Sequence, residues 1–193
     1  MISLHMSKKD KLKAIILIIM TLCVVAFIFM HSLTPATLSA EESGAVTDWL
    51  TNLIPFQLTD HIVRKMAHFT EYSVLGFLTS FTVYSFFKKP TGGIFIKLFV
   101  TLFTAVIDET IQLNVPGRSG QVTDVLLDFS GAVTGIIVST LLILIYLLYK
   151  KRKEMKHSNI ICLRLSDIEL ELVNHAASQA KLSRSDYLRN LIL

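Results

Sequence analysis

The chain has 193 residues, of which 52% are apolar and 18% are charged, and its formal net charge at pH 7 is +4. Soluble domains average roughly 45–50% apolar and about 25% charged residues, and the mean hydropathy of +0.55 also departs from that class. The two cysteines, Cys23 and Cys162, lie far apart, which excludes a disulfide framework and a CxxC metal or redox site. The length excludes a large multidomain enzyme and fits one membrane domain with a small appendage.

Four blocks of the sequence are apolar enough to be considered as membrane spans: 14–30, 72–87, 94–113 and 129–149. A helix needs about 20 mostly apolar residues to cross a hydrocarbon core of about 30 Å. We therefore predict an all-α integral membrane protein with four transmembrane helices. A signal peptide is the alternative for the first block, although that block exceeds the length of about 7–15 residues typical of such a region.

The distribution of basic residues predicts the orientation. Most lysines and arginines lie in 1–13, in 88–97 and in 150–193, whereas 31–66 and 114–128 together hold three. Basic loops stay in the cytoplasm. We therefore expect a multi-pass protein of the bacterial plasma membrane with both termini cytoplasmic and the two poorly basic segments outside.

The most informative residues are polar ones within or beside the apolar blocks. Arg64, His68 and Glu71 are spaced i, i+4, i+7 and share one helix face, as do Asp124 and Asp128. The alternating chain direction places them all near the outer membrane face. An ionisable residue inside the bilayer is costly and marks a functional site by default. The predicted ligand-binding residues are Arg64, His68, Glu71, Tyr72, Asp108, Glu109, Gln112, Arg118, Asp124 and Asp128.

Two kinds of ligand fit this set. Carboxylates with one imidazole can hold a divalent cation such as Mg²⁺, Ca²⁺ or Mn²⁺. The candidate metal ligands are Glu71, His68, Asp108, Glu109, Asp124 and Asp128. Alternatively, Arg64 and Arg118 could hold a phosphate or carboxylate at the level of the lipid headgroups. A third interpretation is purely structural: the two arginines neutralise the carboxylates at the helix ends.

No complete catalytic set is identifiable, because no serine or cysteine nucleophile stands beside an evident base. A binding or resistance protein is therefore favoured. A metal-dependent hydrolase or transferase of the cell envelope remains an alternative, since a histidine near carboxylates can act as a general base.

Three ordered motifs of the sequence resemble those of the VanZ-like membrane protein family, over residues of about 12–150. They read RKMAHFTEY at 64–72, DETIQ at 108–112 leading into VPGRSG at 115–120, and DVLLD at 124–128. One departure is Ile111, where family members often have His. The family is named for a protein associated with low-level teicoplanin resistance. The resemblance implies a role at the bacterial envelope, with a lipid headgroup, a cell-wall precursor or the glycopeptide as the bound ligand.

The C-terminal region predicts a separate cytoplasmic module. Residues 151–158 are a basic linker, and 159–166 (NIICLRLS) alternate as a strand does. Ser166 and Glu169 have the spacing of a capping box at the start of a helix. This β-α-α pattern in 159–193 resembles the ribbon-helix-helix fold. The predicted domains are therefore a membrane domain in 1–150, the linker, and this module.

Two functions are open for the module. By resemblance, Ile160, Cys162 and Arg164 would face DNA bases, and the helix start at Ser183 and Arg184 could hold a phosphate. Two of those three base-facing residues are poor hydrogen-bonding readers, which weakens DNA binding. Self-association through 159–193 is the other prediction, because a lone strand leaves unpaired edges. A membrane-anchored DNA-binding regulator is therefore kept as the alternative function.

Overall fold

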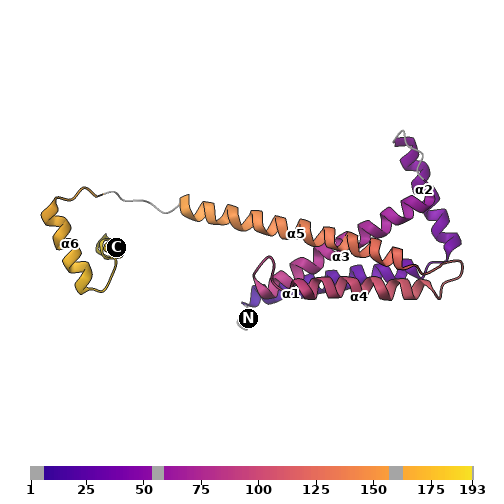
Figure 1. Ribbon diagram of the computed structural model, residues 1–193, viewed down its shortest axis with the longest axis horizontal. Coiled ribbons are helices and arrows are strands. Elements are labelled where there is room, and N and C mark those ends of the chain that lie inside the picture. Colours follow the sequence, from indigo (N-terminus) through magenta and orange to yellow (C-terminus); the bar gives the residue numbers. More distant parts are fainter. Residues whose placement is uncertain (1–6, 54–58, 157–162, 193) are drawn as a thin grey trace. The chain divides into compact units, whose positions relative to one another are not determined.

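The computed structural model describes residues 7–53, 59–156 and 163–192, and all the regular secondary structure in these ranges is helical (Figure 1). The helices are α1 (Lys8–Ser32), α2 (Ala36–Leu53), α3 (Asp60–Phe87), α4 (Ile94–Gln112), α5 (Val122–Lys156), α6 (Asp167–Gln179) and α7 (Arg184–Ile192). The chain divides into two compact units, Met1–Lys150 and Lys151–Leu193. Each unit is described by itself.

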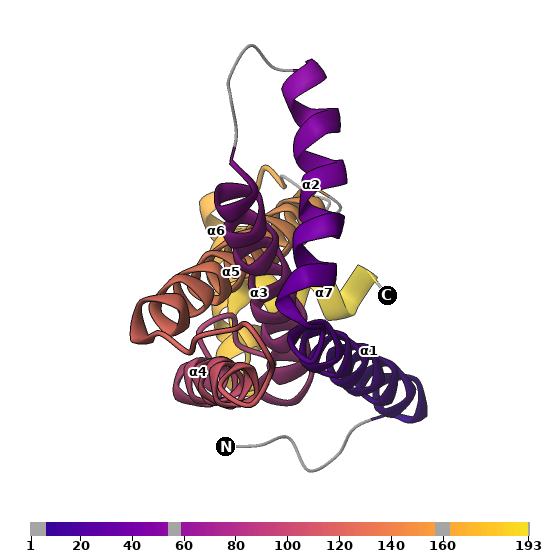
Figure 2. The same cartoon turned by 90° about the vertical axis from the view of Figure 1, so that its right-hand side faces the viewer.

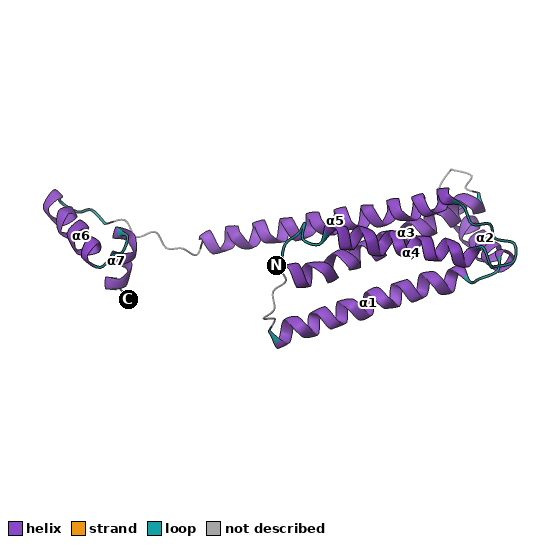
Figure 3. Cartoon of the chain, turned by 60° about the horizontal axis from the view of Figure 1, so that its bottom comes forward, coloured by secondary structure: helices purple, strands orange, loops and turns teal. Residues whose placement is uncertain are grey.

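The first unit is a bundle in which α1, α3, α4 and α5 run alongside one another (Figure 3). Helix α2 leaves the bundle where α1 ends (Figure 2). The apolar core lies between the helices and centres on Ile28, Tyr72, Leu75, Ala105 and Ala132, which are all fully buried. The core therefore joins α1, α3, α4 and α5 directly beneath the region where the polar motifs converge.

Helices α3 and α5 pack backbone against backbone. A Cβ atom added to Gly135 would lie 1.9 Å from the carbonyl oxygen of Ser73, and one added to Gly76 would lie 2.0 Å from that of Ala132. The Ser73 hydroxyl also donates to the carbonyl of Gly131 at 3.0 Å. The GxxxG spacing of α5 therefore serves contact within the chain.

The predicted count of four transmembrane helices is wrong for the part of the chain that is described. Only α1 and the Val122–Lys153 part of α5 are long and apolar enough there to cross a membrane. The charged first turns of α3 confine its uncharged stretch to 72–87, which is shorter than a span requires. Helix α4 has 19 residues, and Lys97, Asp108 and Glu109 interrupt its apolar character.

Helix α4 has its polar residues inside and its large apolar residues outside. Lys97, Thr101 and Asp108 are fully buried, whereas Phe95 and Phe99 are 83% and 66% exposed. Soluble proteins show the reverse distribution. The outer surface of the bundle is therefore suited to an apolar surrounding.

Lys97 was counted with the cytoplasmic basic loop, yet it is buried at the start of α4. Its Nζ donates to the Ser80 hydroxyl at 3.1 Å and to the Pro90 carbonyl at 2.9 Å. Buried polar groups need such partners. Lys97 therefore ties α4 to α3 and to the connection between them.

In the second unit, the predicted helices are present, and no strand occurs among the described residues. Ser166 caps α6 in a capping box with Glu169. The described part of the predicted strand, 163–166, is irregular, and 157–162 lie outside the described residues. The β-α-α module and its resemblance to a ribbon-helix-helix fold are therefore not supported. A short apolar alternation does not by itself specify a strand, because strand pairing needs a second strand to supply the hydrogen bonds.

Candidate functional site

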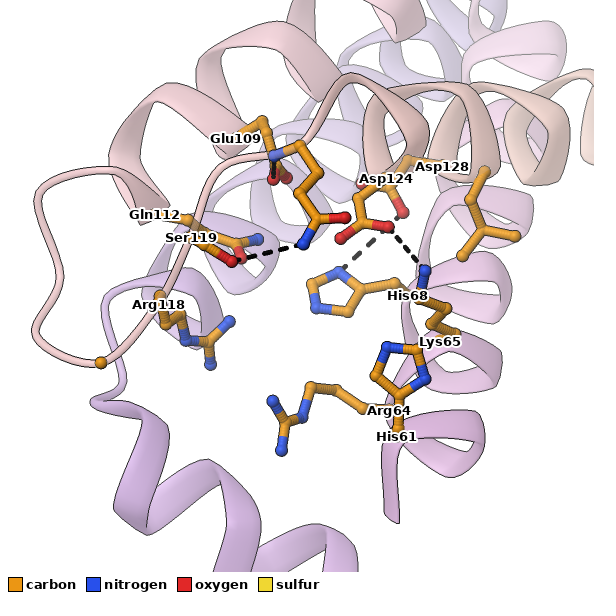
Figure 4. Close-up of a pocket in the computed structure, with 13 residues that line it drawn as sticks. His61, Arg64, Lys65, His68, Glu109, Gln112, Arg118, Ser119, Asp124 and Asp128 are labelled. Carbon is orange, nitrogen blue, oxygen red and sulfur yellow. Dashed lines mark hydrogen bonds and ion pairs between the residues drawn. The ribbon is translucent and has the colours of Figure 1, made fainter. Parts of the chain in front are cut away.

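The polar residues of three helices and one loop converge on a cavity of about 140 Å³ (Figure 4). The first turns of α3, the end of α4, the connection after α4 and the start of α5 form its walls. The lining residues are His61, Arg64, Lys65, His68, Glu109, Gln112, Gly117, Arg118, Ser119, Gln121, Asp124, Leu127 and Asp128. Seven of the ten predicted ligand-binding residues line this cavity, and the other three (Glu71, Tyr72 and Asp108) are on the same helices.

Three buried residues lie together at the inner side of the site, and we call them the floor triad: His68 and Asp128, which line the cavity, and Asp108, which lies beside them outside its lining. The exposed fractions of His68, Asp128 and Asp108 are 8%, 1% and 0%. One ligand atom from each lies within 4.8 Å of the others. The His68 Nδ1 and Asp128 Oδ1 atoms are 4.0 Å apart, which is beyond hydrogen-bond distance. Each of the three side chains has a buried nitrogen or oxygen atom without a hydrogen-bond partner among the described residues.

Glu71 and Tyr72 are directed into the bundle instead of lining the cavity. Glu71 Oε1 lies 2.9 Å from Nδ1 of His31, the last-turn residue of α1. The His31 ring stacks on that of His68, with centroids 5.7 Å apart. The Tyr72 ring is fully buried in the apolar core, and its hydroxyl lies near the Asp108 carboxylate. The sequence interpretation missed His31, although it is the first ionisable residue after the apolar block 14–30 and so marks the same membrane face.

Two further carboxylates already have partners. Asp124 Oδ1 accepts from Lys65 Nζ at 2.9 Å, and this pair joins α3 to α5. Glu109 Oε1 accepts from the backbone amide of Gln121 at 2.6 Å, just before α5 begins. The sequence analysis uses Lys65 only as one of the basic residues that predict the orientation in the membrane. Its position next to Arg64 is the signal in the sequence that it also reaches this site.

Arg118 is held over the cavity by the connection between α4 and α5. Gly117, with a φ of +78°, allows the turn that precedes it. Arg118 Nε donates to the Thr34 carbonyl at 3.0 Å, and one terminal nitrogen donates to the His31 carbonyl at 3.4 Å. These are carbonyls at the C-terminal end of α1, where a cation is favoured. The guanidinium therefore fixes the end of α1, and neither hydrogen bond goes to a carboxylate.

Arg64 is the second guanidinium at the cavity, and it projects towards the same space as Arg118 (Figure 4). Its Nε is buried and has no hydrogen-bond partner within the described ranges. Burial, and then the neighbouring Arg64 charge, lower the pKa of Arg118. Two cations thus share the cavity, and the carboxylates of Asp108, Glu109 and Glu71 act on Arg118 in the opposite sense to Arg64.

Gln112 connects the site to α1. Its Nε2 donates to the Ser32 hydroxyl at 3.3 Å and to Asp108 Oδ2 at 3.4 Å. This leaves Asp108 Oδ1 as the oxygen without a hydrogen-bond partner among the described residues. The amide therefore orients the Asp108 carboxylate through its other oxygen.

The six candidate metal ligands differ in how close together they lie. Glu71 and Glu109 each have one oxygen held by a partner and one buried oxygen without a hydrogen-bond partner among the described residues, and Asp124 pairs with Lys65. Among the described residues, only His68, Asp108 and Asp128 form a group whose ligand atoms all lie within 4.8 Å of one another. The site thus combines an acidic floor, which can hold a cation, with a basic entrance, which can hold an anion.

The residues predicted to contact DNA lie in the second unit. Arg164 is exposed in the irregular segment before α6, and Arg184 is exposed at the start of α7. The Ser183 hydroxyl bonds to Asp186, both through the carboxylate at 2.6 Å and through the backbone amide at 3.2 Å. Ser183 therefore caps α7, and an acidic side chain already occupies this helix start.

Comparison with known proteins gives one family match. The family model described as VanZ/LLP1 matches residues 17–149, which include all the helices that build the cavity. No curated protein and no solved structure matches the chain. The family match together with two membrane-length apolar helices indicates a membrane protein.

Proposed function

The chain belongs to the VanZ/LLP1 family, and we propose that it acts at the bacterial cell envelope by binding a phosphate-bearing lipid headgroup or lipid-linked wall precursor. The observation that carries this proposal is the pair of guanidiniums, Arg64 and Arg118, at the entrance of one cavity. Guanidinium groups match phosphate oxygens in geometry and charge. An anion placed between the two would relieve their mutual repulsion.

The charges at the two membrane-length helices support an outward-facing cavity. Lysines precede α1 and follow the apolar part of α5, whereas the cavity lies at the opposite ends of both helices. The positive-inside rule then puts both chain termini in the cytoplasm and the cavity outside. Wall precursors and glycopeptide antibiotics are met on that side. A resistance-type role against teicoplanin therefore follows as part of the proposal.

Arg64→Gln is the sharpest test of the phosphate site, because Arg118 also holds the end of α1. Geranyl diphosphate, a soluble lipid diphosphate, is titrated into the detergent-solubilised chain and followed by calorimetry. We expect affinity to fall about 10- to 100-fold, since a hydrogen bond to a charged group contributes about 1.5–3 kcal/mol. Lys89→Gln, which removes an exposed cation elsewhere, is the control and should bind as the wild type does.

Equal binding by Arg64→Gln and wild type would contradict the proposal. Teicoplanin is titrated in parallel. If it alone binds, and Arg64→Gln weakens it, then the antibiotic and not a lipid phosphate is the ligand. Teicoplanin susceptibility of cells expressing each variant then tests the resistance role separately.

We further propose that 159–193 associate with a second copy of the chain. In α6 the apolar side chains of Ile168 and Leu172 are 75% and 65% exposed, and Leu191 in α7 is 65% exposed. A small unit that exposes this much apolar surface gains stability by covering it. In the full chain in detergent, Ile168→Glu with Leu172→Glu should convert a dimer to a monomer by light scattering. A wild type that is monomeric at high concentration would refute this.

A further inference from the structure

The two carboxylates of the floor triad have no lysine or arginine partner at ion-pair distance among the described residues. Asp108 and Asp128 are buried, and no described lysine or arginine forms an ion pair with either. Burying uncompensated carboxylates is expensive, because their attraction to water is lost. A cation bound at the floor would balance them.

The distances in the floor triad suit a bound ion better than a hydrogen-bonded network. Two ligand atoms about 2.1 Å from a common cation lie roughly 3–4 Å apart. The His68 Nδ1 to Asp128 Oδ1 separation of 4.0 Å falls at the upper end of this range. One ligand atom from each of the three residues lies within 4.8 Å of the others, so a small shift of the side chains would bring all three to a common ion. Direct hydrogen bonds would need shorter contacts.

The buried atoms of the triad that lack a hydrogen-bond partner are a second indication of a bound ion. His68 Nδ1, Asp108 Oδ1 and Asp128 Oδ1 are buried atoms without a hydrogen-bond partner among the described residues. Their residues are each at least nine-tenths buried. Buried polar atoms are almost always satisfied. Among the buried atoms without a partner in the described residues, these three belong to neighbouring side chains of α3, α4 and α5, which is where a common partner would bind.

We propose that His68, Asp108 and Asp128 bind one divalent cation of the Zn²⁺ or Mn²⁺ type at the floor of the cavity. One imidazole nitrogen and two carboxylates suit these ions better than Mg²⁺ or Ca²⁺, which prefer oxygen ligands alone. Three protein ligands leave positions open towards the cavity, because His68 and Asp128 also line it. The double positive charge of the ion neutralises the two negative charges of the carboxylates.

The surrounding contacts prepare the triad for this ion. Gln112 occupies Asp108 Oδ2 and so leaves Oδ1 available. The His31 ring, itself fixed by Glu71, stacks on His68 and restrains the orientation of the imidazole. Such outer contacts commonly set the geometry of metal ligands. The cation site stands on these residues and does not depend on the phosphate proposal.

The test uses the full chain in detergent, stripped with EDTA and dialysed. Zn²⁺, Mn²⁺, Mg²⁺ and Ca²⁺ are each added alone, with binding followed by calorimetry and bound metal by mass spectrometry. We expect one equivalent of Zn²⁺ or Mn²⁺ per chain in the wild type. His68→Gln and Asp108→Asn should each bind at least about 100-fold more weakly, since each removes a ligand.

Asp10→Asn is the control, because Asp10 is a carboxylate that pairs with Lys88 and does not line the cavity. Its metal affinity should stay within about threefold of the wild type. No stoichiometric metal in the wild type, or an equal loss in Asp10→Asn, would overturn the cation site and indicate that protons neutralise the triad. Geranyl diphosphate binding is measured separately, so failure of the phosphate proposal is distinguished from failure of this one.

Discussion

The bundle buries ionisable groups in two places, and the two differ in how they are satisfied. At one end Lys97 is fully buried and donates to the Ser80 hydroxyl and the Pro90 carbonyl. At the other end Asp108 and Asp128 are as deeply buried, yet each has an oxygen without a hydrogen-bond partner within the described residues. Burial alone therefore does not mark a site. Unsatisfied atoms beside a cavity do.

One face of α4 contributes a residue to both places. The buried polar side chains of α4 are Lys97, Thr101, Thr104, Asp108, Glu109 and Gln112. Most follow the spacing of three to four residues that defines one helix face. The same face therefore provides a structural contact at its N-terminal end and a candidate binding site at its C-terminal end. Substitutions at the two ends should have opposite effects on stability.

The largest expected effect is a loss of stability at the satisfied end. Lys97→Ala removes a fully buried side chain and leaves the Pro90 carbonyl and the Ser80 hydroxyl without their donor. Large-to-small core substitutions cost about 2–5 kcal/mol. We expect the free energy of unfolding to fall by that amount, measured by SDS titration in mixed micelles. Metal affinity of the folded variant should be unchanged.

Lys97→Met separates the two contributions in that experiment. It retains most of the buried volume and removes only the hydrogen bonds, so it should lose roughly 1–2 kcal/mol. If Lys97→Ala has the same free energy of unfolding as the wild type, the lysine does not make the buried hydrogen bonds to Ser80 and Pro90. A changed metal affinity in either variant would mean that the two ends of α4 are coupled.

Much of the first unit follows from the sequence, for reasons that concern helix faces. The spacing of Arg64 and His68, and that of Asp124 and Asp128, is a property of the helix itself, so it could be anticipated. Which polar atoms face each other at 3 Å is set by how the helices are rotated and packed. Local spacing carries no such information. The contacts of Lys65 with Asp124 and of Arg118 with the end of α1 therefore appear only in the structure.

The errors have equally physical causes. The prediction of spans in α3 and α4 rests on composition alone, but charged residues limit the uncharged stretch of α3 and interrupt the apolar sequence of α4. In the second unit the capping box of Ser166 and Glu169 is local, and it was predicted correctly. The strand before it required pairing that a single chain does not provide, and the described residues 163–166 are irregular.

The second expected effect is smaller and opposite in sign. Asp128→Asn replaces a buried carboxylate that no described lysine or arginine pairs with by a neutral side chain of nearly the same shape. In EDTA at pH 8, we expect the free energy of unfolding to rise by about 1 kcal/mol, because removing an uncompensated buried charge relieves its desolvation cost. With Zn²⁺ or Mn²⁺ present the order should reverse, since ligand binding stabilises only the wild type. Asp124→Asn, which breaks an ion pair, should instead lose up to about 1 kcal/mol in both conditions. A loss of stability in EDTA-treated Asp128→Asn would show that the carboxylate is already satisfied, and the floor triad would then resemble Lys97.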